Sequence, residues 1–378
     1  MIVLKDVLLP KGFKAGGICC GIKKTGKKDL ALIYSESRAS AAGMFTTNKI
    51  QAAPVKVSKV YLKDNKAQAI IINSGNANCL TKAKGNSDAK YMSSAAAKNL
   101  KIKAKDVLVS STGIIGKPLP IGKIIKGIPT LVGKLSRNGI SDAALAILTT
   151  DTKKKSISVR IMINGKTVTI CGIAKGVGMI YPKMATMLSF ITTDIAISPG
   201  ALKKVLKTAV DNSFHCISID GCRSTNDMVL ILANGQAKNK KLDFKDRALS
   251  IFSNALNYVC LELAKKIVYD AEGATKFIQI NVRGAKNSGD AKEAAFAIAN
   301  SNLLKTAIYG ENRNLGRIFS AIGQTGIKIN EGKIHVATSS LKNKEIKITI
   351  NLNMGQSQST VYTSDLTTEY VRINARYN

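Results

Sequence analysis

Thr186 is the residue of this sequence whose surroundings offer the most definite chemistry. It follows the stretch AKGVGMIYPKMA, in which glycine, proline and small or unbranched side chains precede the Ala185-Thr186 bond. A threonine hydroxyl is a weak nucleophile, but a threonine at a chain start has its own α-amino group as base, with a pKa near ~7.7 to 8.0. Thr186 could act in this way only if the bond before it is cut. From the pattern alone, a core strand with a glycine-rich entry is the simpler interpretation.

The segment DVLVSSTGIIG, residues 106–116, offers a site for negative charge. Its apolar residues predict a buried strand that runs into a glycine-bearing turn. Backbone N–H groups at such a turn point outward, where an anion can use them. Thr112 and Gly113 lie at this turn, although an ordinary turn threonine is the simpler interpretation of Thr112 on its own.

Short strands and helices surround these two segments. Asn164-Gly165, after alternating apolar residues, is a strong signal for a two-residue hairpin turn, and the strand after it leads toward Thr186. Ser198 followed by Pro199 predicts a helix start, and another helix is expected to begin near residue 87. Further expected elements are helices over 247–268 and 291–304 and strands over 29–35, 67–74, 277–282, 333–339 and 345–352.

This mixture of strands and helices predicts a layered α/β or α+β architecture. At 378 residues with 45% hydrophobic side chains, the chain can bury a sizeable core. Periodicity does not determine how the strands connect. We expect three parts: a core domain over 1–195, a helical and mixed part over 196–276, and a smaller α+β unit over 277–378.

The net charge of +33 suggests a nucleic-acid partner, and a Lys-rich nucleic-acid-binding protein is one alternative. The excess consists of dispersed lysine, with 47 Lys against 10 Arg, whereas nucleic-acid readers favour Arg and exposed aromatic rings. Aromatic residues make up only 5% of the chain, and Trp is absent. We therefore favour a protein without a nucleic-acid partner.

Metal sites and membrane spans find little support in the sequence. The longest apolar runs, such as VLILANG, are far shorter than the ~18 to 20 residues that cross a bilayer. The N-terminal MIVLKDVLLPKGFK lacks the features of a signal or transit peptide, so we expect a cytoplasmic location. The seven cysteines include no C-x-x-C pair, and His215 and His335 are the only histidines, so we expect no metal site.

The stretch KGVGMIYPKMATMLSFITTD, residues 175–194, resembles the nucleophile motif of the ornithine acetyltransferase (ArgJ) family, usually KGxGMIxPNMATMLxFxTTD. These are the bifunctional glutamate N-acetyltransferases of arginine biosynthesis. Only Lys183 departs from the motif, where the family commonly has Asn. Further resembling blocks, in family order, are AAGMFTTNKIQAAPV, INSGNAN, SSTGIIGKP, LTTDT, STND, YDAEGATK and GENRNLGRI. The resemblance therefore covers essentially the whole chain.

The resemblance implies roles for individual residues. Thr186 is the nucleophile released by cleavage at Ala185-Thr186, and Thr112 and Gly113 form the oxyanion hole, where losing one donor typically costs about 2.7 to 4 kcal/mol. Substrate-binding positions are implied for Thr149, Lys175, Thr186, Glu272 and Asn374.

Two of these positions have an implied chemical role. Lys175 would pair with a substrate carboxylate, and Glu272 would hold the substrate ammonium group or help proton transfer. A plain surface or capping role is the alternative for Thr149, Lys175, Glu272 and Asn374. Thr149 is the least secure of the four, because neighbouring threonines allow a register slip.

The implied reaction is a ping-pong exchange. The acetyl group of N2-acetyl-L-ornithine passes to Thr186, ornithine leaves, and L-glutamate takes the acetyl group as N-acetyl-L-glutamate. No cofactor is implied, and some family members also use acetyl-CoA. The resemblance further implies an α-β-β-α sandwich of the self-cleaving DmpA/ArgJ type with a smaller C-terminal α+β unit. It also implies a heterotetramer of two α chains, residues 1–185, and two β chains, residues 186–378.

The departures from the family pattern lie in supporting segments. Cys222 and Arg223 replace an Asp-Thr pair, and Arg313 and Leu315 replace Pro and Trp. The family usually has Ser or Thr five residues past the position of Asn374, and this chain ends one residue short of that point. We expect weaker stability or affinity rather than lost chemistry. An aminopeptidase or amidase on the same self-cleaving fold is the second alternative.

Overall fold

The computed structural model describes residues 1–181 and 187–376 of the chain. The chain divides into two compact units. Unit 1 comprises residues 1–176, 183–214 and 223–264, and unit 2 comprises residues 177–182, 215–222 and 265–378. Within the described ranges, every helix is too short or too polar to span a membrane.

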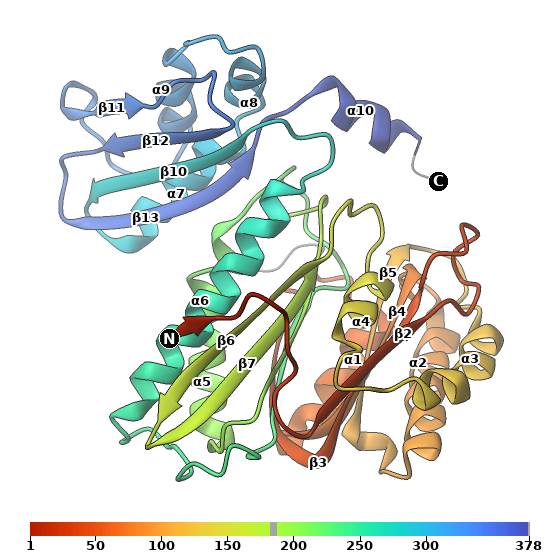
Figure 1. The fold of residues 1–378 in the computed structure, drawn as a ribbon. Coiled ribbons are helices and arrows are strands. Elements are labelled where there is room, and N and C mark those ends of the chain that lie inside the picture. Colours follow the sequence, from red (N-terminus) through yellow and green to blue (C-terminus); the bar gives the residue numbers. More distant parts are fainter. Residues whose placement is uncertain (182–186, 377–378) are drawn as a thin grey trace. The chain divides into compact units, whose positions relative to one another are not determined.

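Unit 1 is built on a nine-stranded sheet with the order β1-β6-β7-β8-β9-β3-β4-β5, in which β2 also pairs with β3 (Figure 1). The long strand β3 pairs with β2 and β4 through its first half and with β9 through its second half. The sheet therefore has two halves that share β3. Its strands are β1 Ile2–Val3, β2 Phe13–Ile18, β3 Leu30–Phe45, β4 Lys66–Asn76, β5 Val107–Ile114, β6 Lys155–Ile163, β7 Lys166–Lys175, β8 Leu188–Thr193 and β9 Met228–Ala233.

Alternate residues of these strands face two different cores. Ile70 and Ile72 of β4 pack in an inner core with Phe190 of β8 and other residues of β7 and β9. Ile71, between them in sequence, packs instead in an outer core with residues of α1, α2 and α3. The two halves of the sheet thus face each other, and helices cover the outer face of the β4 half. The helices of unit 1 are α1 Ala53–Tyr61, α2 Lys82–Leu100, α3 Ile121–Gly133, α4 Ile140–Ala146, α5 Pro199–Asp211 and α6 Ala248–Tyr269, whose last residues belong to unit 2.

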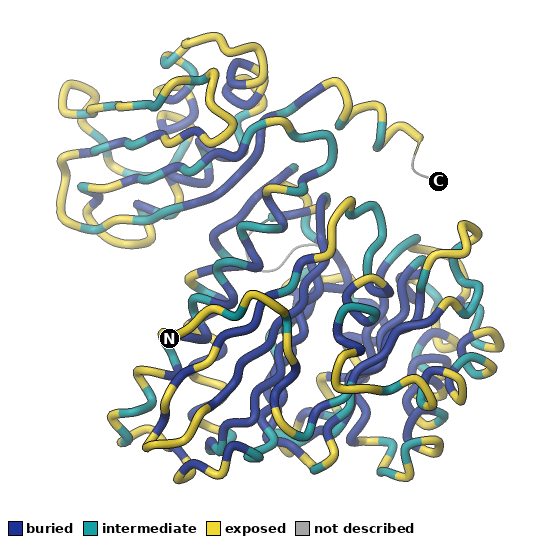
Figure 2. The backbone as a smooth tube through the Cα atoms, viewed as in Figure 1, coloured by how far each residue is buried: buried dark blue, intermediate teal, exposed yellow. Residues whose placement is uncertain are grey.

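Helix α6 covers the outer face of the other half. Gly172 of β7 lies so close to this helix that a Cβ atom there would sit 2.8 Å from Leu263 and 3.1 Å from Val259. Cys171 and Ile173, on either side of it, face the inner core. The layering is therefore helix, sheet, sheet, helix, which confirms the expected α-β-β-α architecture. Figure 2 shows the same pattern, with buried residues concentrated along the strands.

Local signals predicted several elements well. The turn residues Asn164 and Gly165 have φ of 49° and 74° and join β6 to β7, which confirms the hairpin. Ser198 accepts a hydrogen bond from the backbone N–H of Ala201 and caps α5, and α6 matches the long helix expected over 247–268.

The expected start of the second helix near residue 87 was wrong, because α2 begins at Lys82. Its start depends on a loop rather than on a serine cap. The Asn78 side chain donates to the carbonyl oxygen of Gly85 and accepts from the Thr81 hydroxyl, which draws the loop onto the first helical turn.

Unit 2 contains a four-stranded sheet with the order β11-β12-β10-β13 and the helices that pack on it (Figure 1). The helix expected over 291–304 is two helices, because the Ser301 side chain accepts from the N–H of Leu304 and caps a new one. The strands are β10 Phe277–Ala285, β11 His335–Thr338, β12 Glu345–Asn351 and β13 Ser357–Ser364, and the helices are α7 Ser288–Ala299, α8 Asn302–Tyr309, α9 Gly316–Gly323 and α10 Thr368–Ala375.

Candidate functional site

Thr112 and Gly113 lie near the end of β5, the last strand of the sheet in unit 1. Thr112 is 3% exposed. Gly113 has φ 133°, and a Cβ atom there would lie 2.3 Å from the carbonyl carbon of Gly75 in β4. Only glycine fits at such a position, since no side chain can enter the neighbouring backbone. The two strand ends are therefore locked together, and the Gly113 peptide is held in one orientation.

The side chain of Asn226, in the loop before β9, holds the end of β5. Its amide nitrogen donates to the carbonyl oxygen of Ser111 at 2.8 Å and to that of Ala77 at 2.6 Å. The Thr225 hydroxyl donates to the amide oxygen of Asn226 at 2.6 Å and so fixes the orientation of the amide. Since Ser111 directly precedes Thr112, this side chain helps position the predicted oxyanion residues.

The next side chain, Asp227, holds the start of the segment that leads into β8. Its Oδ1 accepts from the backbone N–H of Met187 at 3.0 Å. Among the residues that the structure describes, Oδ2 is buried and has no hydrogen-bond partner. Burial raises the pKa of Asp227 well above its usual value, although Lys175 and Arg223 act in the opposite direction. This surrounding disfavours the ionised form of the carboxyl group.

A second buried carboxylate, Asp151, collects groups at the end of β7. It accepts from the Nζ of Lys155 at 2.7 Å and from the backbone N–H of Gly176 at 2.8 Å. Its other oxygen accepts from the Thr149 N–H at 3.0 Å and lies 3.9 Å from the Nζ of Lys175. Two predicted substrate residues, Thr149 and Lys175, are thus brought together by a carboxylate that the sequence had not singled out.

The electrostatics of this cluster favour full ionisation of Asp151. Burial alone would raise its pKa, but Lys175, Lys155 and the Gly176 N–H outweigh burial and hold the pKa at about 2. The Lys175 and Lys155 side chains are 2% and 1% exposed, so both ammonium groups depend on nearby oxygen atoms for compensation. The Asp151 carboxylate therefore lies beside two buried lysine side chains, one of which is the predicted substrate residue Lys175.

In unit 2, the predicted residues Glu272 and Asn374 are hydrogen-bonded to each other. The Asn374 amide nitrogen donates to Glu272 Oε2 at 3.0 Å. The backbone N–H of Glu272 donates to the carbonyl oxygen of Val177, and a Cβ atom on Gly178 would lie 2.6 Å from Glu272 Oε2. The glycine of the motif therefore leaves room for this carboxylate beside the chain that precedes the predicted cleavage position.

A further carboxylate of unit 2, Asp220, holds that same chain. It accepts from the backbone N–H groups of Met179 and Ile180, at 2.5 and 2.9 Å. The Tyr370 hydroxyl of α10 donates to Asp220 at 3.3 Å, and burial followed by the negative charge of Asp220 raises the Tyr370 pKa. Met179 has φ 57°, a left-handed conformation that these two hydrogen bonds stabilise.

Ala185 and Thr186 lie outside the described residues. Asp151, Asp220, Asn226 and Asp227 are the site residues to which sequence reasoning assigned no role. Three of them were visible inside recognised blocks, Asp151 in LTTDT and the Asn226-Asp227 pair in STND. Their partners could not be read from the sequence, because each binds backbone groups of a distant segment.

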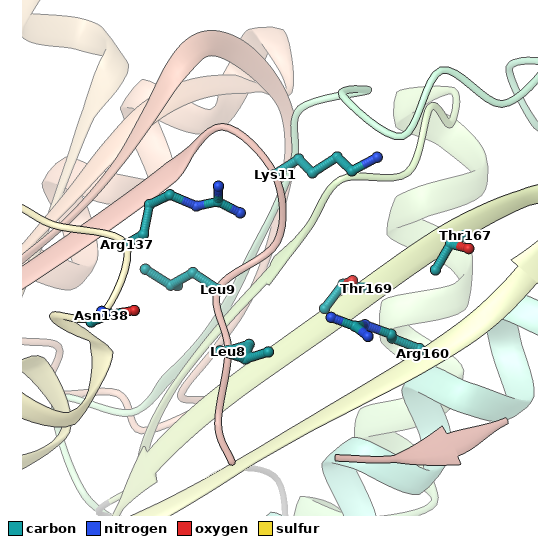
Figure 3. A pocket seen from close by; sticks show the side chains of 8 residues that line it. All are labelled: Leu8, Leu9, Lys11, Arg137, Asn138, Arg160, Thr167 and Thr169. Atoms are coloured by element: carbon teal, nitrogen blue, oxygen red, sulfur yellow. The ribbon is translucent and has the colours of Figure 1, made fainter. Parts of the chain in front are cut away.

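The pocket of about 440 Å³ in Figure 3 is separate from these groups. Lys11, Arg137 and Arg160 border it, and none of the predicted site residues lines it. Thr167 and Thr169, which also line it, lie near the start of β7, whereas Lys175 is the last residue of that strand. Within residues 1–181 and 187–376, no three His, Cys, Asp or Glu side chains gather as metal ligands.

The α-β-β-α layering, with polar groups gathered at the ends of its strands, defines an α/β enzyme of the four-layer sandwich type. The family model that matches residues 14–378 is that of the ArgJ family, and the chain belongs to this family. The family and the enzyme class expected from the sequence are confirmed.

Relatives support this membership along the whole chain. The arginine biosynthesis bifunctional protein ArgJ of Caldanaerobacter subterraneus subsp. tengcongensis is 46% identical, over 98% of this chain and 97% of its own. The protein of the same name from Geobacter sulfurreducens is 42% identical, over 97% and 99%. Among solved structures, the ornithine acetyltransferase of Mycobacterium tuberculosis, complexed with ornithine, is 36% identical, over 48% of this chain and 97% of its own, with a TM-score of 0.45.

Proposed function

We propose that this protein is a glutamate N-acetyltransferase that moves an acetyl group from N2-acetyl-L-ornithine to L-glutamate. It would first cut itself between Ala185 and Thr186, giving chains of residues 1–185 and 186–378. One observation supports this above all others. Met187, the residue after Thr186, is tied through Asp227 and Asn226 to the strand end of Thr112 and Gly113.

Self-cleavage makes the nucleophile. The Thr186 hydroxyl adds to the Ala185 carbonyl carbon, the peptide C–N bond breaks as its nitrogen takes a proton, and water hydrolyses the resulting ester. The products are an Ala185 carboxylate and a Thr186 with a free hydroxyl and a free α-amine. That amine, with a pKa near ~7.7 to 8.0, can take the hydroxyl proton at neutral pH.

Acetyl transfer follows in two half-reactions. The Thr186 oxygen attacks the acetyl carbonyl of acetylornithine, the amide C–N bond breaks, and ornithine leaves with the proton on its amine. The amine of glutamate then attacks the acetyl ester and regenerates the hydroxyl. The Thr112 hydroxyl and the Gly113 N–H stabilise the oxyanion of each tetrahedral intermediate, and the locked Gly113 peptide needs little reorganisation to do so.

Several of the predicted substrate residues carry groups suited to an amino-acid substrate. Lys175 would bind a substrate carboxylate; its Nζ lies 3.9 Å from Asp151, which also accepts from the Thr149 N–H. Glu272 would bind the substrate ammonium group, and Asn374 orients that carboxylate by its hydrogen bond. Ornithine and glutamate share the α-amino and α-carboxyl groups that such contacts recognise.

We propose further that the cleaved fragments stay together as a heterotetramer of two α and two β chains in the cytoplasm. The chemistry needs no cofactor, because the nucleophile, its amine and the oxyanion donors belong to the chain. Acetyl-CoA is an additional donor to test, since its thioester could acetylate Thr186 by the same attack.

Denaturing mass spectrometry tests self-cleavage directly. Purified protein is expected to give two polypeptides, with the second starting at Thr186, whereas Thr186→Ala is expected to give one. Thr208→Ala, an exposed threonine on α5, is a matched control that should be cut as in wild type. A folded wild-type protein that stays in one piece would exclude the self-cleavage step.

Incubation with labelled acetylornithine tests the transfer. Without glutamate, the label should remain on Thr186 as an ester, and with glutamate it should appear as N-acetylglutamate. Release of free acetate or cleavage of short peptides would instead indicate an amidase or aminopeptidase. Salt-sensitive retention of DNA with no acetyl transfer would indicate a nucleic-acid-binding protein.

A further inference from the structure

The strand that follows the predicted nucleophile and the strand that carries the predicted oxyanion donors are not neighbours in the sheet. Thr186 precedes β8, and Thr112 and Gly113 lie at the end of β5. Along the sheet, β9, β3 and β4 separate these two strands. No ladder of backbone hydrogen bonds therefore joins β8 to β5 directly, so side-chain contacts near the two strand ends can help to set the spacing of the two parts of the site.

Asn226 and Asp227 make the contacts that span this gap. Asn226 binds the backbone of β5 at Ser111, and Asp227 binds the backbone N–H of Met187 at the entry to β8. The two side chains are consecutive and are 4% and 1% exposed. Their Cα atoms are joined by one planar peptide unit, and burial limits the movement of both side chains.

We propose that Asn226 and Asp227 are positioning residues that set the spacing between Thr186 and the oxyanion donors, both for self-cleavage and for acetyl transfer. This inference rests on the proposed function, because it takes Thr186 as the nucleophile. Neither side chain has to touch the substrate. Each acts through the backbone that it holds, Asn226 through residue 111 and Asp227 through residue 187.

The two side-chain types suit these tasks. An amide NH2 group has two donors and here meets two carbonyl oxygens, those of Ala77 and Ser111. A carboxylate in place of the Asn226 amide has no hydrogen-bond donor, so it could not bind the same two carbonyl oxygens. Asp227 needs only one acceptor oxygen for the Met187 N–H. An amide oxygen could replace it, so Asn should substitute for Asp227 whereas Ala should not.

The experiment compares Asn226→Ala, Asn226→Asp, Asp227→Ala and Asp227→Asn with wild type. The rate of self-cleavage is followed by mass spectrometry, and kcat and KM for acetyl transfer are measured on the cut protein. Misplacement of reacting groups by about 1 Å can cost 10²-fold in rate. We expect Asn226→Ala, Asn226→Asp and Asp227→Ala to lose about 10- to 100-fold in both rates, with KM changed only a few-fold. Asp227→Asn should stay within about 5-fold of wild type.

Two matched controls separate positioning from general stability. Asn239 is a buried amide that binds backbone groups of residues 196 and 240, and Asp194 is a buried carboxyl that binds the backbone N–H groups of Lys11 and Thr169. Asn239→Ala and Asp194→Asn should lower the melting temperature by amounts similar to the site variants. Both should keep wild-type cleavage and kcat.

A milder variant keeps the test decisive if Asn226→Ala does not fold. Thr225→Val keeps the shape of the side chain but removes the hydroxyl that orients the Asn226 amide. It should lower kcat about 3- to 10-fold without changing KM. Wild-type rates in Thr225→Val, or in folded Asn226→Ala, would overturn the proposal.

Failure of the inference can be told apart from failure of the proposed function. If wild type neither cuts itself nor transfers acetyl groups, the function is wrong. If wild type is active and Thr186→Ala is not, but Asp227→Ala equals wild type, only the positioning role is wrong. Loss of activity in Asp227→Asn as deep as in Asp227→Ala would also overturn positioning, because it would mean that Asp227 acts through its ionisable proton.

Discussion

Asp151 and Asp227 are two fully buried carboxyl groups of the same unit in opposite electrostatic surroundings. Asp151 has the Nζ of Lys155 at 2.7 Å and that of Lys175 at 3.9 Å, and its pKa is held at about 2. Asp227 accepts one backbone N–H, and burial raises its pKa well above the usual value. Burial acts in the same direction on both, so the neighbours decide the charge.

The difference indicates that the two carboxyl groups have different roles. An ionised Asp151 can hold two buried ammonium groups, which a neutral group could not compensate. The raised pKa of Asp227 favours the uncharged form, which can hold a backbone N–H without bringing an uncompensated charge into the core. Under the proposed function, the Asp151 carboxylate would serve substrate binding through Lys175, and Asp227 would serve alignment of the chain.

The largest expected effect comes from Asp151→Asn. Lys155 and Lys175 would stay buried without their carboxylate, and breaking such a buried ion pair typically costs about 3 to 5 kcal/mol. Urea unfolding at pH 7, in the Thr186→Ala background so that the chain is uncut, measures the loss. Asp211→Asn breaks an exposed pair with Lys207 and should cost less than about 1 kcal/mol. Equal losses of unfolding free energy in Asp151→Asn and Asp211→Asn would show that the buried ion pairs of Asp151 contribute no more than an exposed pair.

Lowering the pH is expected to have a smaller effect on the free energy of unfolding. Because the folded pKa of Asp151, about 2, lies below its ordinary value of 3.8, its carboxylate stabilises the fold above the ordinary value. That contribution, about 2 kcal/mol, is lost as pH falls from about 5 toward 2. Unfolding measured across this range should show the loss in Thr186→Ala and not in the variant that also carries Asp151→Asn. A parallel decline in both would contradict the assignment to Asp151.

The contribution of Asp227 to the free energy of unfolding should change with pH in the opposite direction, and by a smaller amount. Its folded pKa is raised, so its contribution is complete below the unfolded value and is lost as pH rises toward the folded one. The slope is at most about 1.4 kcal/mol per pH unit. Asp227→Asn should remove this slope above the ordinary pKa of Asp and leave the protein more stable as pH rises. Identical pH profiles with and without the substitution would show that Asp227 is ionised in the folded state.

The elements that sequence predicted well are those that depend on neighbouring residues. The Asn164-Gly165 turn and the Ser198 cap act within a few residues and were confirmed. The start of α2 depends on Asn78 in the preceding loop. The break between α7 and α8 depends on the Ser301 cap, which is as local as the Ser198 cap but was missed. The polar strand β13 had no apolar alternation to reveal it. The three-part division of the chain stays a prediction.

For the site, the motifs named the residue types but not their partners. Thr149, Lys175, Glu272 and Asn374 came from family resemblance, and their roles stay predictions. Asp151 was visible only as part of a block, because its bonds to Lys155 and Gly176 need the ends of β6 and β7 to meet. The Asn226 bond to Ser111 spans 115 residues of sequence, beyond the reach of any periodicity.

The sequence by itself determined the layered α/β or α+β class from local patterns of residue types, and the order of its motifs carried the resemblance that implied the family and the four-layer arrangement. Tertiary structure alone decided which carboxyl groups are ionised and which strand ends are tied together. The physical reason is that a pKa and a spacing depend on groups that are close in space. The chain brings Asp227 to Met187 and Asn226 to Ser111 only when both halves of the sheet close on the inner core.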